Sequence, residues 1–304
     1  FKAKDGNDYQ LNLIDTPGHV DFSYEVSRSL AACEGAILVV DAAQGVEAQT
    51  LANATLAKDA GLLIIPVINK IDLPAANIEK VREEIDADLG LDPFIAIPVS
   101  AKTGVGITDV LEGVVAQLPC PKGDPAAPLK ALVFDAHFDT YRGVILQVRV
   151  MEGTLKTGEM IHFMHSGRDY KVDELGYNQL KLNPKKQLSV GEVGYIVAGV
   201  KSVQDIEIGD TLTLLNYQAS EPIPGYKKAK QVVFSSIYPM STDEYQDLTK
   251  ALEKLAINDA ALTFEKDSSA ALGFGFRCGF LGLLHLDVIQ ERLQRELNST
   301  DEPC

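Results

Sequence analysis

The stretch Leu11-Asn12-Leu13-Ile14-Asp15-Thr16-Pro17-Gly18-His19 decides the fold, because it joins an apolar segment to a polar, turn-forming one. Its first half predicts a buried strand, and its second half predicts a loop at the carboxyl end of that strand. Two further apolar segments end in the same way, one in Asn69-Lys70-Ile71-Asp72 and the other in Ser100-Ala101-Lys102. Polar motifs at the carboxyl ends of successive strands are typical of a nucleotide site in an open α/β sheet. Each motif taken alone would equally suit an ordinary turn between a strand and a helix.

Helical patterns alternate with these apolar segments, which predicts a parallel, doubly wound α/β sheet. The expected strands lie near residues 11–15, 36–41, 62–68 and 94–99, and the expected helices near residues 21–33, 47–60, 77–89 and 107–118. The chain opens with a predicted hairpin, in which Lys2-Ala3-Lys4 faces Tyr9-Gln10-Leu11 across an Asp5-Gly6 turn. A hairpin at the first residue indicates that the chain starts inside a domain.

The motif that normally cradles phosphates is missing. Such a loop would read G-x-x-x-x-G-K-[ST], and the chain contains no Gly-Lys dipeptide. The loop, its lysine, its Mg²⁺-binding hydroxyl and the strand before it would therefore lie upstream. We expect the sheet of residues 1–119 to be incomplete for this reason.

Two further regions follow this partial domain. After a proline-rich linker at residues 120–128, residues 129–217 show short strands and Gly turns without a helical period, which predicts a β-barrel. A second linker, residues 218–229, leads to residues 230–304, whose pattern is β-α-β-β-α. That order is a split βαβ, or ferredoxin-like α+β domain, without its last strand. We expect this domain to be incomplete too.

Composition and charge narrow the class of protein. With 304 residues, of which 46% are hydrophobic, the chain can bury cores for two or three domains. No apolar run approaches the ~20 residues that span a bilayer, and the four scattered cysteines are typical of free thiols in a reducing compartment. These features favour a cytoplasmic protein. The net charge of −15 argues against indiscriminate nucleic-acid binding, and we expect no DNA partner.

In their order and context, the motifs at residues 15–19, 69–72 and 100–102 resemble the third, fourth and fifth signatures of the translational GTPases. The stretch Ala270-Ala271-Leu272-Gly273-Phe274-Gly275-Phe276-Arg277-Cys278-Gly279-Phe280-Leu281-Gly282-Leu283-Leu284-His285 resembles the signature of the LepA, or elongation factor 4, family. The short distance from Asp72 to Ser100 leaves no room for the extra subdomain of the main translocase. The resemblance covers the whole chain, as an internal fragment: a partial P-loop GTPase domain, then barrel and α+β domains of the translation-factor II and III types.

The resemblance implies that the motif residues bind GTP or GDP together with Mg²⁺. Gly18 has no Cβ and can offer its backbone N–H to the γ-phosphate. Asp15 can reach the Mg²⁺ shell, through a water molecule in our interpretation. Asp72 presents two acceptor oxygens to the N1–H and amine of guanine. The other residues expected at the base are Asn69, Lys70, Ser100, Ala101 and Lys102.

His19 is the expected catalytic residue. Phosphoryl transfer leaves a protein mainly with positioning and electrostatic work, which includes orienting the attacking water. In ribosomal GTPases, the histidine after Asp-x-x-Gly holds that water when the ribosome docks it. The alternative is a solvated loop histidine without a catalytic role, and its position directly after Gly18 favours catalysis.

The LepA resemblance further implies GTP hydrolysis coupled to ribosome binding, with back-translocation of tRNA and translation fidelity as its outcome. The expected partners are ribosomal RNA and ribosomal proteins, and tRNA through C-terminal domains that this chain lacks. The family also implies peripheral association with the cytoplasmic face of the cell membrane, and we expect a monomer. Because the phosphate loop is missing, the alternative for this polypeptide is a non-catalytic ribosome-binding module, and we expect it to be inactive alone. Another translational GTPase without the extra subdomain is the remaining alternative.

Overall fold

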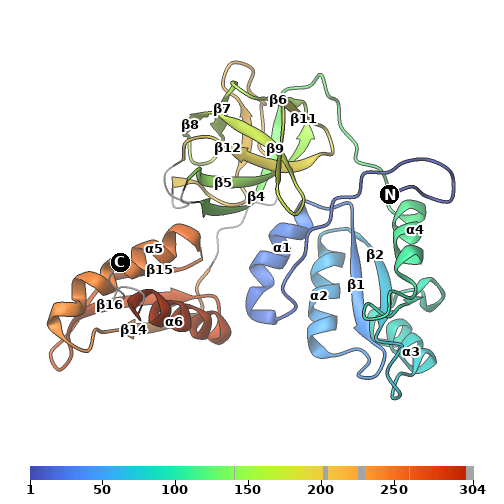
Figure 1. Ribbon diagram of the computed structural model, residues 1–304, viewed down its shortest axis with the longest axis horizontal. Helices are drawn as coiled ribbons and strands as arrows, with labels where there is room; N and C mark the ends of the chain where they lie inside the picture. The colour runs from blue at the N-terminus through green and yellow to red at the C-terminus, as the bar shows by residue number, and fades with distance from the viewer. Residues whose placement is uncertain (140, 201–204, 225–229, 260, 299–304) are drawn as a thin grey trace. The chain divides into compact units, whose positions relative to one another are not determined.

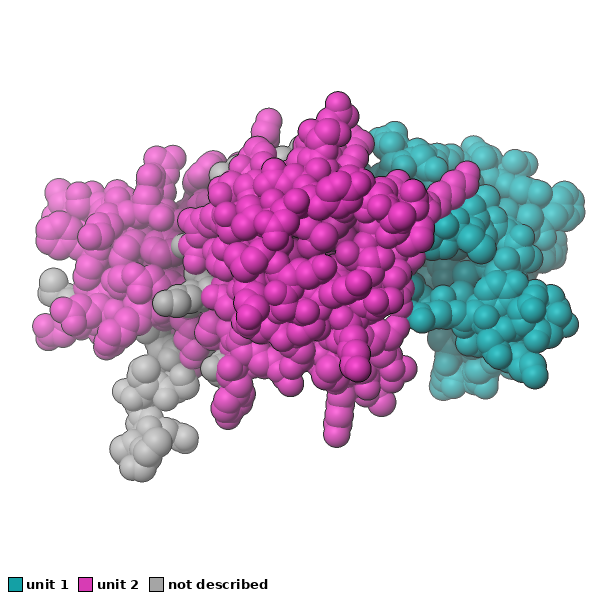
Figure 2. Space-filling model, turned by 90° about the horizontal axis from the view of Figure 1, so that it is seen from above, with its two compact units in different colours: residues 1–121 teal, residues 122–304 magenta. Residues whose placement is uncertain are grey.

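The computed structural model describes residues 1–304 except 140, 201–204, 225–229, 260 and 299–304. The chain divides into two compact units, Phe1–Pro121 and Lys122–Cys304, which Figure 2 shows in different colours. The finer division into domains at residues 1–119, 129–217 and 230–304, with linkers at 120–128 and 218–229, stays a prediction.

A parallel three-stranded sheet with helices packed against it forms the first unit (Figure 1). Strand β1 (Gly35–Asp41) pairs with β2 (Leu63–Asn69), and β2 pairs with β3 (Ile97–Pro98). The helices are α1 (Ser23–Ala31), α2 (Ala48–Asp59), α3 (Ile78–Leu89) and α4 (Ile107–Gln117), with 3₁₀ turns η1 (Val20–Phe22) and η2 (Pro93–Ile95). The predicted α/β class is confirmed, and each of the four predicted helices is present close to its expected bounds.

Helix α3 shows how the local sequence sets these elements. Its N-terminus is capped by Asn77, whose side chain accepts a 3.1 Å hydrogen bond from the backbone N–H of Lys80. Val81, Ile85 and Leu89 follow at helical spacing and are all buried. Gly90 ends the helix with a positive φ of 56°, a conformation that a residue with a Cβ rarely adopts.

The strand predicted at residues 11–15 is wrong, because residues 9–18 form neither helix nor strand. A strand needs a neighbour to satisfy its backbone N–H and C=O groups. Within the described part of the chain, β1 pairs only with β2 and is therefore the edge strand of the sheet. No strand of the described residues fills the space between β1 and residues 9–18, so this segment has no strand to pair with. A cavity of about 620 Å³ lies there instead. Leu13 and Val39, on its two sides, stay exposed although both are apolar.

Two other local expectations differ in detail from the structure. The strand expected at residues 94–99 is shortened to β3, because Pro93 begins the 3₁₀ turn η2, which Asp92 caps by accepting from the N–H of Phe94 at 2.9 Å. The opening hairpin is present as a single antiparallel bridge between Lys2 and Asp8, not as the predicted pairing of residues 2–4 with 9–11.

An all-β region follows in the second unit. Its eight-stranded antiparallel sheet has the order β10-β9-β12-β5-β4-β13-β7-β8, and β11 pairs with β6 in a second, two-stranded sheet. Both sheets contribute to one apolar core that includes Val148, Leu155 and Leu188. The strands are β4 (Lys130–Asp139), β5 (Gly143–Glu152), β6 (Thr154–Lys156), β7 (Met160–Phe163), β8 (Asp169–Lys171), β9 (Glu174–Asn178), β10 (Leu182–Lys185), β11 (Gln187–Ser189), β12 (Val193–Val197) and β13 (Thr211–Leu214). The predicted all-β barrel is confirmed.

The last part of the chain is an α+β arrangement. Strand β16 lies between β14 and β15 in an antiparallel sheet, and α5 and α6 share its apolar core. The elements are β14 (Val233–Ile237), η4 (Thr242–Glu244), α5 (Tyr245–Asn258), β15 (Thr263–Ser269), β16 (Gly273–Phe280) and α6 (Leu283–Asn298). Their order is the predicted β-α-β-β-α pattern of a split βαβ fold.

Buried His285 links two helices of this last part by hydrogen bonds. Its Nδ1 accepts a 3.0 Å hydrogen bond from the backbone N–H of Leu281, and its Nε2 lies 3.0 Å from Oδ2 of Asp259. Since Nδ1 accepts, the neutral ring carries its proton on Nε2 and donates it to the carboxylate. The glycine-rich signature thus supplies β16 and a histidine that ties the start of α6 to the end of α5.

Two further findings concern the whole described chain. No helix in the described ranges is both long and apolar enough to cross a lipid bilayer. Cys33, Cys120 and Cys278 are free thiols, and Cys304 lies outside the described residues.

Candidate nucleotide site

The carboxyl edge of the parallel sheet brings together the loops that carry most of the predicted base-binding residues. Asp41 at the end of β1 is the register partner of Asn69 at the end of β2. Beyond β3, the N–H of Val99 bonds to the carbonyl of Ile68, which holds the Ser100 loop beside the Asn69 loop. The parallel register therefore places three loop starts at one edge, where α/β sheets bind ligands.

Asp72 and Ser100 are joined directly across two of these loops. The Ser100 hydroxyl donates a 2.7 Å hydrogen bond to Oδ1 of Asp72 and accepts one of 3.2 Å from the N–H of Thr103. Ser100 is only 1% exposed, so its hydroxyl is fixed by the loop around it. The hydrogen bond from Ser100 is the main cause that holds the pKa of the Asp72 carboxyl below its usual value of 3.8. The shift favours the ionised carboxylate, which can only accept hydrogen bonds.

Asn69 makes the second link between the same loops. Its side-chain Oδ1 accepts a 3.0 Å hydrogen bond from the backbone N–H of Ala101. Together the two bonds define a four-residue group, which we call the base frame: Asn69, Asp72, Ser100 and Ala101. Lys102 follows as an exposed side chain, and its positive charge also lowers the pKa of Asp72.

Lys70 reaches back from the same loop to the end of β1. Its Nζ lies 2.7 Å from Oδ2 of Asp41, and this pair lowers the pKa of Asp41 and raises that of Lys70. Lys70 has a φ of 67° and is the one residue other than glycine with positive φ in the described ranges. A lysine in this conformation is strained, and such strain is often found at binding sites.

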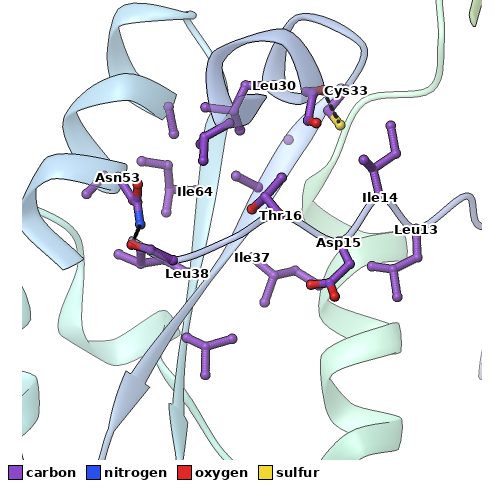
Figure 3. A pocket seen from close by; sticks show the side chains of 18 of the residues that line it. Leu13, Ile14, Asp15, Thr16, Leu30, Cys33, Ile37, Leu38, Asn53 and Ile64 are labelled. Carbon is purple, nitrogen blue, oxygen red and sulfur yellow. Dashed lines mark hydrogen bonds between the residues drawn. The ribbon is translucent and has the colours of Figure 1, made fainter. Parts of the chain in front are cut away.

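Asp15 and Gly18 lie on the irregular segment before α1, beside the cavity next to β1. Figure 3 shows the side chains of Leu13, Ile14 and Asp15 on this segment, with residues of β1 and α1 around the same space. The carbonyl of Gly18 accepts a 3.0 Å hydrogen bond from the side-chain amide of Asn53 on α2, drawn dashed in Figure 3. Helix α2 thus anchors the turn, while both Asp15 and Gly18 stay exposed.

His19 stands at the start of η1 and caps it. Its Nδ1 accepts a 3.2 Å hydrogen bond from the backbone N–H of Asp21 and lies 3.7 Å from the carboxylate of the same residue. The side chain is 40% exposed. In the neutral ring, Nδ1 is the acceptor and Nε2 carries the proton. The ring is therefore held at one nitrogen, with an N–H on the other.

The residues present suit a Mg²⁺ ion whose ligands are mainly water molecules and nucleotide phosphates. No cluster of three or more His, Cys, Asp or Glu side chains that could hold a metal occurs within the part of the chain that the structure describes. Mg²⁺ commonly keeps several waters and takes one or two carboxylates along with substrate phosphates. The exposed Asp15 fits such a ligand through water.

The structure thus joins four of the six predicted base residues by hydrogen bonds, namely those of the base frame. Asp15, Gly18 and His19 lie on a separate segment, where Asn53 of α2 bonds to Gly18 and His19 caps η1. Two residues in these contacts escaped the sequence analysis. Asp41 pairs with Lys70. Its position at the end of the strand predicted at residues 36–41 could have marked it as a residue of this edge of the sheet. Asn53 bonds to Gly18 from the middle of a helix, where no local pattern marks it.

Two known families match this chain. The family described as "Elongation factor Tu GTP binding domain" matches residues 2–120, and "Elongation factor Tu domain 2" matches residues 143–213. The first match contains the parallel sheet with every predicted site residue, and the second falls within the barrel. Fold and matches together define the class: the GTP-binding domain and following β-barrel of a translation elongation factor.

Relatives identify the family within that class. Elongation factor 4 2 of Rhodopirellula baltica is 78% identical over 298 residues, which are 98% of this chain and 50% of that protein. Elongation factor 4 of Desulfotalea psychrophila is 61% identical over 298 residues, which are 98% of this chain and 50% of that protein. Elongation factor 4 of Streptococcus pneumoniae is 60% identical over 298 residues, which are 98% of this chain and 49% of that protein. The chain belongs to the elongation factor 4 family. It spans about half the length of the curated relatives it matches.

Proposed function

We propose that this chain is part of a ribosome-dependent translational GTPase that hydrolyses GTP to GDP and phosphate. The observation that carries the proposal is the base frame, in which Ser100 fixes the Asp72 carboxylate and Ala101 fixes the Asn69 amide. The names of the relatives, elongation factors, support translation as the process. Within translation, we propose back-translocation of tRNA and control of fidelity, on the strength of the family signature at residues 270–285.

The base frame suits guanine for a chemical reason. Guanine presents an N1–H and an exocyclic amine side by side, and an ionised carboxylate offers two acceptor oxygens to them. Adenine has no proton on N1, so one carboxylate oxygen would face an acceptor. Ser100 holds Asp72 in one orientation before any base arrives, which reduces the cost of ordering it on binding.

We further propose that His19 positions the attacking water. Because Nδ1 accepts from the N–H of Asp21, the ring in this state offers Nε2–H as a donor to the water oxygen. His19 in this orientation would orient the water and would not remove its proton, which agrees with the mainly positional catalysis of phosphoryl transfer. Mg²⁺ would neutralise charge on the phosphates, and Asp15 would hold it through water. Gly18 would offer its N–H to the γ-phosphate.

Hydrolysis by the full-length protein that contains this chain tests the proposal. His19→Ala should lower the ribosome-stimulated rate about a hundredfold, on the scale expected when positioning is lost. The affinity for GTP should barely change, because His19 acts on water. His162→Ala is the matched control, since His162 pairs with Asp169 in the barrel. Normal turnover in the His19 variant would remove His19 from the mechanism, and a wild-type protein without ribosome-stimulated hydrolysis would favour the non-catalytic ribosome-binding module.

A further inference from the structure

We infer that Asp41 is a positioning residue of the base site, which holds Lys70 so that the lysine stem forms a fixed wall for the guanine ring. The inference rests on the proposed function and deepens it, because it assigns a role in nucleotide recognition to a residue outside the signature motifs. It starts from the 2.7 Å contact between Nζ of Lys70 and Oδ2 of Asp41.

The sheet register puts the two residues within reach. Asp41 is the Cα partner of Asn69, the residue before Lys70, so the last residue of β1 lies directly beside the start of the Asn69–Asp72 loop. The backbone supports the same contact, since the N–H of Ala42 donates to the carbonyl of Asn69 at 2.8 Å. The strained φ of Lys70 is maintained in this setting, where the side chain spans from one strand end to the next.

Asp41 is itself held in place, which makes it a suitable anchor. Its Oδ1 accepts from the N–H of Ala43 at 2.7 Å and from that of Gln44 at 3.2 Å, and its carbonyl accepts from the N–H of Gly45 at 2.9 Å. The side chain of Asp41 is 15% exposed, whereas that of Lys70 is 54% exposed. One carboxylate oxygen therefore fixes the turn, and the other fixes the lysine.

The ion pair between Asp41 and Lys70 orders the lysine side chain before a base binds. A lysine side chain has four rotatable bonds, and ordering it at the moment of binding costs conformational entropy. With its ammonium group engaged by Asp41, the stem of Lys70 is already ordered in the loop that carries Asp72. Its methylene groups can then lie along the face of a planar ring, as amphipathic stems do on apolar surfaces. Asp41 would thus act on the nucleotide through Lys70.

A double-mutant cycle on the full-length protein tests this inference, with GDP dissociation constants as the readout. Asp41→Asn is the sharp variant, because the amide oxygen can still accept from the N–H groups of Ala43 and Gln44 while the charge facing Lys70 is lost. We expect it to weaken GDP binding about twofold to fivefold, the range for a partly exposed charge pair. Asp109→Asn is the control, since Asp109 pairs with Lys4 at 3.5 Å on an exposed surface.

The cycle separates positioning from a structural role. In the background of Lys70→Ala, Asp41→Asn should cause no further loss of GDP affinity, because the partner through which Asp41 acts is gone. The same loss in both backgrounds would mean that Asp41 supports the turn alone, and the inference would be overturned. A wild type that binds no GDP would overturn the proposed function and this inference together, whereas GDP binding that Asp41→Asn leaves unchanged would overturn this inference only.

Discussion

Ser100 donates a 2.7 Å hydrogen bond to Oδ1 of Asp72, although the two residues lie 28 positions apart in the chain. The bond joins the loop after β2 to the loop after β3, and it fixes a carboxylate that would otherwise rotate freely at the edge of the sheet. It also lowers the pKa of Asp72, so that this side chain stays an acceptor as the pH falls toward 3.8. The orientation of the Asp72 carboxylate is thus set by a side chain from a different loop.

Replacement of this hydroxyl should weaken nucleotide binding. We expect Ser100→Ala to raise the dissociation constant for GDP in the full-length protein about tenfold, because it removes a charge-assisted hydrogen bond that orients Asp72. Thr103→Ala is the matched control, since Thr103 is exposed and contributes only its backbone N–H to Ser100. Fluorescence titration with a labelled GDP measures both. Equal affinities in wild type and Ser100→Ala would show that Asp72 needs no such support.

Asp72→Asn should shift base preference from guanine toward xanthine. The carboxylate accepts from N1–H and an amine, whereas the NH₂ group of an amide can donate to the 2-oxo group of xanthine. An amide oxygen can still accept from the Ser100 hydroxyl, so the frame should survive the change. Competition between GTP and XTP measures the preference, with Asp88→Asn on the exposed face of α3 as the control. The same ratio of the two affinities in wild type and variant would refute the assignment.

The 304-residue chain itself should bind GTP no better than about millimolar, because the phosphates lack the backbone cradle and lysine that carry much of the affinity in such sites. The base frame is present, but Gly18 supplies one amide where a complete site supplies several. Calorimetric titration with GTP and Mg²⁺ decides the matter. Micromolar binding would mean that other residues of this chain build a phosphate site.

The stability of the α+β part should depend on pH through Asp259. Burial raises the pKa of its carboxyl, but the hydrogen bond from His285 and those from the N–H groups of Ala261 and Leu262 lower it by more, to below 3.8. A lowered pKa in the folded state stabilises the fold fully above the unfolded value of 3.8, and the stabilisation is lost as the pH falls through the folded value.

Asp259→Asn should therefore lower the free energy of unfolding by about 1.5 to 3 kcal/mol near pH 7, the range for hydrogen bonds to charged groups. The difference from wild type should shrink as the pH drops below 3.8. Urea unfolding across that range measures it, with Asp247→Asn as the control, because Asp247 forms an exposed pair with Lys250 at 3.5 Å. If the difference in free energy of unfolding between wild type and Asp259→Asn does not change with pH, the ionisation of Asp259 does not stabilise the fold.

Local chemistry made much of the first unit predictable from sequence. Helix α3 begins at Asn77 and ends before Gly90 because capping and the left-handed turn depend on the residues themselves. In the same way, the polar motifs at residues 69–72 and 100–102 follow β2 and β3 because apolar strands end where polar turns begin. The base frame was predicted as a set of residues, although not as a set of bonds.

The sequence alone therefore determined which helices and turns form and in what order, because these elements depend on residues close by in the chain. The tertiary structure decided everything that needs a partner from elsewhere. Residues 11–15 have the composition of a strand but form none, since a strand exists only when another strand takes up its hydrogen bonds. Lys70 meets Asp41, 29 positions earlier, because parallel pairing sets Asp41 beside Asn69. Register is a relation between segments, and no single segment contains it.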